Sequence, residues 1–132
     1  MSNKWLFKIE LKDKTIFKKY ERDYNIIFPS ELEAFVLNNN ASSPEQNAVD
    51  FNGVERIYDE TLSFNLCDEE ASTFNSAMKA VNCEDCLPFA KDPFGDYFCY
   101  NLENETVSFY NHEEDRIEKS DIGFHQFIEM LH

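Results

Sequence analysis

Two of the four cysteines stand at the spacing of a metal-binding or redox pair. Cys83 and Cys86 enclose two acidic residues, whereas Cys67 and Cys99 stand alone in the chain. Structural zinc needs four ligands, and a single C-x-x-C pair can also be a redox centre. Only half of the zinc spacing is present, and acidic neighbours raise the pKa of a thiol and oppose redox reactivity. We interpret all four cysteines as reduced packing or surface residues and expect no cofactor.

A histidine followed by an acidic run is the second group that could do chemistry. His112 precedes the acidic residues 113–115, and such a set can bind a divalent metal or hold the histidine as a general base. No second histidine stands at metal-ligand spacing. We interpret the segment as a solvated turn after a strand. A small metalloenzyme that uses His112 is kept as an alternative, which metal analysis of the purified protein would test.

Four acidic clusters fall in segments that we expect to connect helices and strands. They are Asp59 and Glu60; Asp68, Glu69 and Glu70; Glu84 and Asp85; and Glu113, Glu114 and Asp115. Connectors face water, so these carboxylates can meet a partner, although Glu69 and Glu70 are also favoured simply because a helix begins there. If the fold brings the clusters to one end, they form one acidic face. We take these ten residues as the candidate partner-binding site.

Motifs of common enzyme classes are missing. The chain has three glycines, too few for a phosphate-binding loop, and it contains no G-x-S-x-G motif. Nothing in the sequence therefore predicts an enzyme.

Length and charge limit the kind of partner. The 132 residues suit one domain with a sizeable core, and 13 phenylalanines predict a core built on rings. Twenty-six acids against twelve bases give a net charge of −14, so nucleic acid is not expected as a direct partner. Residues 1–22 hold seven bases and three acids, and the rest is strongly acidic. Such a surface attracts cationic partners, and it also simply keeps a protein soluble.

The sequence shows no pattern typical of a targeting signal or a membrane span. The N-terminus runs into a mixed-charge segment rather than an apolar one, and no window approaches the eighteen apolar residues of a membrane span. We expect a cytoplasmic protein with no membrane partner, in which the thiols are reduced.

Periodicity predicts the N-terminal elements. Residues 4–12 alternate as a half-buried strand with its apolar side chains on one face. Helical spacing follows over 15–23, and a second helix begins at Pro29, with Ser30 and Glu33 as a capping box. Residues 40–47 form a polar loop.

The middle of the chain reads as a hairpin and a third helix. Asn52 and Gly53 between residues 48–51 and 54–58 are a strong hairpin signal. A short strand over 62–66 follows, then a helix that begins at Glu69 or Glu70.

The last third contains a hairpin and a final helix. A turn at 93–95 precedes strands over 96–102 and 106–110. Ser120 or Asp121 caps the helix, whose apolar face consists of Phe124, Phe127, Ile128 and Leu131. Helices grouped between strand runs predict a single α+β domain over 1–132, with an antiparallel-dominated mixed sheet and about four helices packed around it.

These same segments resemble a known family. An apolar-Pro-Phe-Ala run at 87–90 leads into a Gly-Asp-aromatic strand at 95–97. A strand ending in Asn-His-Glu at 111–113 and the Phe-rich helix at 124–131 follow. In this order they resemble the SUKH superfamily, which is named for bacterial immunity proteins and includes yeast cell-wall-synthesis regulators. Upstream, residues 5–7, 16–24 and 28–37 are similar to its first strand and first two helices.

The resemblance implies a non-enzymatic, bacterial protein-binding domain. Its immunity members occlude a toxin delivered by a neighbouring cell, often a nuclease. The charge agrees independently, because a nuclease carries basic groups around its phosphate site and an acidic protein can compete for them. The alternative is a regulatory or scaffold domain without a toxin partner, as the eukaryotic members suggest.

Overall fold

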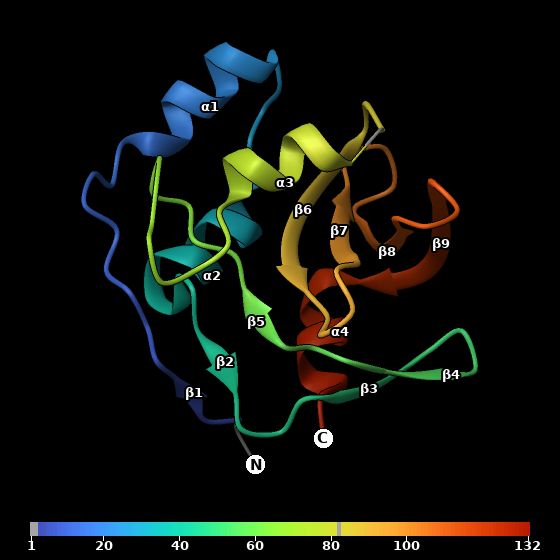
Figure 1. The fold of residues 1–132 in the computed structure, drawn as a ribbon. Helices are drawn as coiled ribbons and strands as arrows, with labels where there is room; N and C mark the ends of the chain where they lie inside the picture. Colours follow the sequence, from blue (N-terminus) through green and yellow to red (C-terminus); the bar gives the residue numbers. More distant parts are fainter. Residues whose placement is uncertain (1–2, 82) are drawn as a thin grey trace.

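A five-stranded antiparallel sheet runs through the C-terminal half of the chain, in the order β5-β6-β7-β8-β9. The computed structural model describes residues 3–81 and 83–132. Within them, two short antiparallel pairs, β1–β2 and β3–β4, lie beside the main sheet together with four helices (Figure 1). The α+β prediction with an antiparallel sheet and four helices is confirmed.

The bounds of the elements are as follows. The helices are α1 (Ile16–Tyr24), α2 (Ser30–Asn39), α3 (Phe74–Ala80) and α4 (Phe124–Met130). The strands outside the main sheet are β1 (Trp5–Leu6), β2 (Ser43–Pro44), β3 (Ala48–Phe51) and β4 (Val54–Ile57). The strands of the main sheet are β5 (Glu60–Thr61), β6 (Cys86–Lys91), β7 (Tyr97–Asn101), β8 (Thr106–Asn111) and β9 (Arg116–Gly123).

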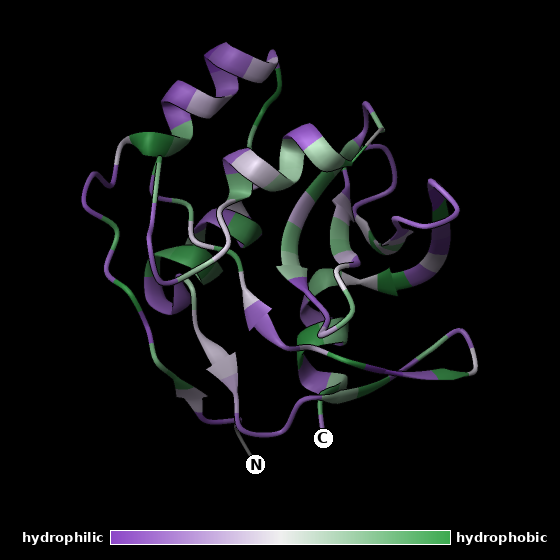
Figure 2. Cartoon of the chain, viewed as in Figure 1, coloured by the Kyte–Doolittle hydropathy of each residue, from purple (hydrophilic) through white to green (hydrophobic). Residues whose placement is uncertain are grey.

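Aromatic rings fill the core, as the composition predicts. On α4, Phe124 and Phe127 are buried and pack against Phe89 and Phe98 of the sheet. Burial of side chains of this size is worth roughly 1.5–3 kcal/mol each, and it fixes α4 across the sheet. Figure 2 shows the contrast with α1, which is hydrophilic along most of its length.

The predicted turns form with the expected backbone. Asn52 and Gly53 both have positive φ, 51° and 84°, which is the geometry of the tight turn that joins β3 to β4. Gly95 has φ of 91° between β6 and β7. The predicted hairpins, β3–β4 and β7–β8, are both confirmed by their antiparallel pairing, as is the turn at 112–115.

The predicted strand over 4–12 is wrong beyond its start. Only Trp5 and Leu6 form a strand, and Phe7 has a left-handed φ of 62° that leaves its side chain 81% exposed. Side-chain amides, rather than a neighbouring strand, donate hydrogen bonds to the backbone carbonyls of this segment. The Nδ2 atom of Asn40 donates to the Ile9 carbonyl at 2.9 Å, and that of Asn65 donates to the Glu10 carbonyl at 3.1 Å.

Two helix starts also differ from the prediction. Pro29 is the N-cap of α2 and Ser30 is already helical, so no capping box forms. Thr73 caps α3, accepting from the Ser76 amide at 3.1 Å. A threonine oxygen that satisfies a first-turn amide defines the start of a helix better than acidic residues do. Glu69 and Glu70 consequently lie in the loop before α3.

Three strands differ from the prediction, one in its position and two because no strand was predicted there. The short strand predicted over 62–66 is β5, Glu60–Thr61, and the polar loop 40–47 contains β2. β9 occupies residues that precede the predicted helix, and Gly123 rather than Ser120 or Asp121 is the N-cap of α4. The Ser120 hydroxyl instead donates to the Val107 carbonyl at 2.6 Å, bridging β9 to β8.

Among the described residues, none of the helices is long and apolar enough to span a bilayer.

Candidate functional site

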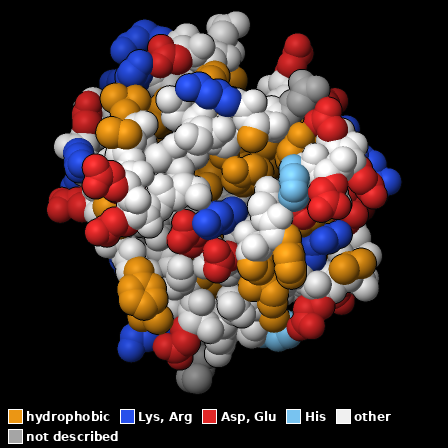
Figure 3. All heavy atoms as spheres, viewed as in Figure 1, with side chains coloured by type: hydrophobic (Ala, Val, Ile, Leu, Met, Phe, Trp, Pro, Cys, Tyr) orange, Lys and Arg blue, Asp and Glu red, His pale blue; other side chains and the backbone are white. Residues whose placement is uncertain are grey.

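Three of the four thiols gather on one side of the sheet. The Sγ atoms of Cys83 and Cys86 are 2.7 Å apart, and Cys86 and Cys99 are buried in a small cluster with Val81 and Tyr110. Burial raises the pKa of the Cys86 and Cys99 thiols, which keeps them protonated. Figure 3 shows hydrophobic side chains gathered over β6 and β7 on this face.

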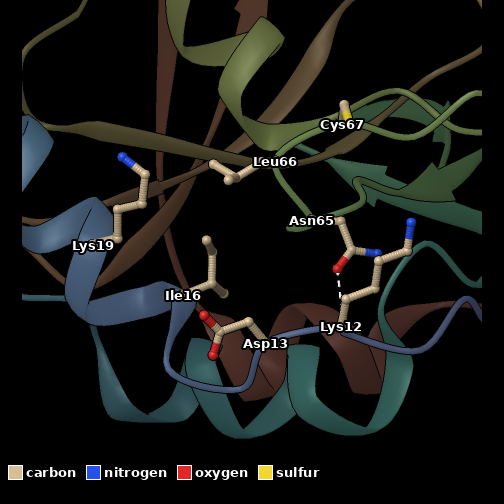
Figure 4. A pocket seen from close by; sticks show the side chains of 7 residues that line it. All are labelled: Lys12, Asp13, Ile16, Lys19, Asn65, Leu66 and Cys67. Atoms are coloured by element: carbon tan, nitrogen blue, oxygen red, sulfur yellow. Dashed lines mark hydrogen bonds between the residues drawn. The ribbon is translucent and has the colours of Figure 1, made fainter.

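The fourth thiol lies elsewhere. Cys67 is exposed and lines a cavity of about 190 Å³ beside α1, between Ile16, Leu66 and two lysines (Figure 4). The chain therefore does not assemble a four-cysteine site. More generally, no group of three or more His, Cys, Asp or Glu side chains is arranged to hold a metal ion within residues 3–81 and 83–132.

His112 is bound to a carboxylate that the sequence argument overlooked. Its backbone amide donates to Asp96 Oδ1 at 3.0 Å, and its Nδ1 lies 2.5 Å from the same oxygen. The hydrogen bond to Asp96 raises the pKa of His112. The ring also packs over Gly95, where a Cβ atom would lie 3.4 Å from it. The histidine thus fastens the 112–115 turn to the 92–96 turn.

A second buried carboxylate shapes the 92–96 turn itself. Asp92 Oδ1 accepts from the Phe94 and Asp96 amides, both at 2.9 Å. Burial raises the pKa of Asp92, and these two hydrogen bonds act in the opposite direction. The turn holds Phe94 outward, with 76% of its surface exposed. Asp-Pro-Phe-Gly-Asp was visible in the sequence as a turn, but nothing in it indicated that the phenylalanine side chain would be exposed.

The structure brings two of the predicted acidic clusters together at Glu60. Glu60 and Glu70 line one cavity of about 290 Å³, with the exposed ring of Phe7 on the same cavity. The Ser72 amide also lies 3.5 Å from a Glu60 carboxylate oxygen. The 68–70 loop therefore lies against the edge strand β5.

Glu60 also contacts Lys91, the last residue of the neighbouring strand β6. Lys91 Nζ lies 3.5 Å from Glu60 and 4.0 Å from Asp59, and the Asp59 amide donates to the Lys91 carbonyl. Lys91 ends β6 immediately before the 92–96 turn, which holds His112 and with it the cluster 113–115. Three of the four clusters are thus linked along one end of the sheet, with basic side chains between them.

The remaining cluster lies at the opposite end. Glu84 and Asp85 precede β6, and the Asp85 carbonyl accepts from the Leu102 amide at 2.7 Å beside the β7–β8 turn. Both residues are exposed on a cavity of about 580 Å³ shared with Tyr24 and Met78.

The ten predicted residues differ in how strongly they are engaged within the chain. Asp68 accepts from the Ser63 hydroxyl at 2.6 Å, and Glu114 pairs with Arg116 at 3.1 Å. Asp115 accepts from the Tyr110 hydroxyl. Five others are exposed: Glu69, Glu70, Glu84, Asp85 and Glu113. On the face in Figure 3, acidic and basic side chains alternate, so the excess of negative charge is a net effect rather than an unbroken patch.

Comparison with known proteins places the chain in a family. A family model of the SUKH group, described as SMI1-KNR4 cell-wall, matches residues 14–128. No curated protein and no solved structure matches the chain.

Proposed function

The chain belongs to the SUKH family described as SMI1-KNR4 cell-wall, and from this premise we propose that it works by binding another protein rather than by catalysis. Membership of the family is consistent with an immunity or a regulatory role. Within that range we propose an immunity protein that occludes a cationic toxin, with nuclease toxins as the first class to test. The observation that carries the proposal is the linkage of three acidic clusters along one end of the sheet.

The proposed binding surface is this linked set of carboxylates. It consists of Asp59, Glu60, Asp68, Glu69, Glu70, Glu113, Glu114 and Asp115, and we call it the acidic end. Glu84 and Asp85, from the other end of the sheet, extend the surface only for a partner large enough to cover the whole face. The exposed members, which are the ones a partner meets first, are Glu69, Glu70, Glu113, Glu114 and Asp115.

Two aromatic side chains support the acidic end as a docking surface. Phe7 shares a cavity with Glu60 and Glu70, and Phe94 stands on the turn that joins two clusters. Exposed rings held by a defined backbone are typical binding anchors, because little entropy is lost when they are covered. The carboxylates around them would then steer a basic partner and form the rim.

Co-expression with a candidate nuclease toxin from the same organism tests the proposal. We expect this protein to restore growth of cells that make the toxin. In vitro, the association rate should fall at least about tenfold between low salt and about 0.5 M salt, because salt screens charges beyond a few ångströms. Failure to rescue growth together with no measurable complex would overturn the immunity role.

Charge reversal locates the surface. Glu70→Lys and Glu113→Lys should each slow association several-fold, since both carboxylates are exposed at the acidic end. Glu129→Lys on α4 is the matched control, because it changes the net charge by the same amount at another exposed position. Equal effects of all three variants would show that only the total charge matters.

A regulatory or scaffold role without a toxin is the second candidate, favoured by the cell-wall description of the matching family model. Purification of the tagged protein from its own cells, followed by mass spectrometry, separates the two. A basic toxin as the stoichiometric partner supports immunity, and a resident host protein as that partner supports regulation.

A further inference from the structure

The connector between α3 and β6 holds two sulfur atoms in contact. Val81 is the C-cap of α3, its amide donates to the Ala77 carbonyl, and Cys86 begins β6 opposite Asn101. The Asp85 carbonyl is fixed by the Leu102 amide. With both sides of the connector anchored in this way, the Sγ atoms of Cys83 and Cys86 lie 2.7 Å apart.

The two thiols differ in access to solvent. Cys83 is half-buried, whereas only 1% of Cys86 is exposed. An oxidant in solution therefore reaches Cys83 first, and Cys86 stands behind it. Cys99 is fully buried in the same cluster, and Cys67 is exposed beside α1, so neither of these cysteines combines access with a thiol neighbour in contact.

We propose that Cys83 and Cys86 are a redox-active dithiol. Low-molecular-weight disulfides such as oxidised glutathione oxidise it reversibly to an internal Cys83–Cys86 disulfide. The contact between the sulfur atoms, their unequal exposure and the anchored connector carry this assignment. It replaces the interpretation of Cys83 and Cys86 as inert packing residues, which rested on the incomplete zinc spacing and on the acidic neighbours.

The exchange proceeds in two balanced steps. The Cys83 thiolate attacks one sulfur of oxidised glutathione, the glutathione S–S bond breaks, and one glutathione thiolate leaves and takes up a proton. The Cys86 thiol then loses its proton, and its sulfur attacks the Cys83 sulfur of the mixed disulfide. The second glutathione leaves as a thiolate and is protonated. The protein loses two electrons and two protons, and oxidised glutathione becomes two molecules of reduced glutathione.

The surroundings assign the two roles. Burial raises the pKa of Cys86, the contact with Cys83 and the charge of Asp85 act in the same direction, and Lys119 opposes them. A protonated, buried thiol is a poor attacking group but serves as the resolving one once its partner is joined to glutathione. Cys83 is thus the attacking thiol.

Closing the disulfide would restrain the segment that carries Glu84 and Asp85, the acidic cluster between the two cysteines. An effect of oxidation on partner binding rests on the proposed function, but formation of the disulfide does not. The two ideas therefore fail separately.

Thiol counting on the whole chain tests the assignment. The reduced protein is incubated with oxidised glutathione, quenched with acid and alkylated with N-ethylmaleimide under denaturing conditions. We expect the four alkylated cysteines of the reduced protein to fall to two or fewer, with a Cys83–Cys86 peptide that lacks two hydrogen atoms and carries no glutathione. Treatment with dithiothreitol should restore all four.

Single variants supply the controls. Cys67→Ser and Cys99→Ser should still form the disulfide, whereas Cys86→Ser should stop at a glutathione adduct on Cys83. A wild-type protein that keeps both thiols, retains glutathione on Cys83 or links Cys83 to another cysteine would overturn the proposal. Amide hydrogen exchange gives a second readout, because oxidation should slow exchange in residues 83–86 and leave α4 unchanged.

Discussion

At the scale of single residues, two buried carboxylates hold the sheet end in shape. Asp92 satisfies the amides of its own turn, and Asp96 accepts both from the backbone and from the ring of His112. A carboxylate that accepts several hydrogen bonds defines a loop more tightly than apolar contacts do. The backbone position of Phe94 and the position of the 112–115 turn both depend on this pair.

The bond between His112 and Asp96 predicts a pH-dependent stability. The pKa of His112 is raised above its ordinary value of 6.5, so the stabilisation is fully present below that pH and is lost as the pH rises through the raised pKa. The difference in unfolding free energy between wild type and His112→Ala should therefore be larger at pH 5.5 than at pH 8.5. Urea unfolding at both pH values measures it.

His125→Ala is the matched control for that experiment, because this histidine lies on α4 and its side chain is more exposed. The interpretation fails if the two variants show the same dependence on pH.

A second prediction concerns Asp92 and distinguishes the contribution of its hydrogen bonds to stability from that of its charge. Asp92→Ala removes the acceptor of two amides and should lower the free energy of unfolding by about 1–3 kcal/mol. Asp92→Asn keeps an acceptor oxygen. Burial raises the pKa of Asp92. The free energy of unfolding of the wild-type protein therefore falls as the pH rises through that pKa, whereas that of the asparagine variant does not. Between pH 4 and pH 7, the stability of the asparagine variant should therefore rise relative to that of the wild type.

Equal losses in the two Asp92 variants at neutral pH would show that the charge, rather than the accepted hydrogen bonds, matters. Thermal and urea unfolding of both proteins give the comparison.

At the scale of elements, burial of its apolar side chains holds α4 in place, and its N-cap contributes little. Its N-cap, Gly123, makes no side-chain cap hydrogen bond, and its φ of −70° suits any residue. A Cβ atom at this position meets nothing within 4 Å. Packing of Phe124 and Phe127 therefore holds a helix whose cap is far from optimal.

A serine at this cap should stabilise the protein. Gly123→Ser supplies a capping oxygen and removes the freedom of glycine in the unfolded chain, for a gain of about 0.5–1 kcal/mol. Gly53→Ser is the opposing control: Gly53 has φ of 84°, so a side chain strains the β3–β4 turn and lowers stability. Denaturant midpoints that move in the same direction for both variants would contradict this account.

At the scale of the whole molecule, charge is distributed unevenly. Residues 84–132, which contain four of the five strands of the main sheet, carry twelve acids and three bases. The segment before Asp23, which includes most of α1, carries an excess of bases. Residues 23–83 carry eleven acids and two bases, so the negative charge is spread over the chain after the basic N-terminal segment.

Net charge of −14 should make stability depend on salt. Repulsion between carboxylates opposes folding, and salt screens it. We expect the melting temperature to rise by a few degrees between about 10 mM and about 150 mM sodium chloride. An unchanged or falling melting temperature would mean that attractive pairs such as Lys91 with Glu60 outweigh the repulsion.

Local sequence alone determined the elements whose signals lie within a few residues of one another. The Asn52–Gly53 hairpin requires only a turn with positive φ, and the α4 face requires only apolar residues at helical spacing. The α+β class and the family resemblance followed from such segments in order. In each case the physical cause, backbone preference or periodic burial, is short-range.

Tertiary structure alone decided where distant residues meet. The alternation of residues 4–12 did not extend into a strand, because Asn40 and Asn65 satisfied its backbone from elsewhere. Likewise, no local pattern could place Asp96 on His112 or Glu70 beside Glu60, since these contacts exist only once the sheet has formed. Hydrogen bonds and charges act through space, and only the packed chain decides which of them come within reach.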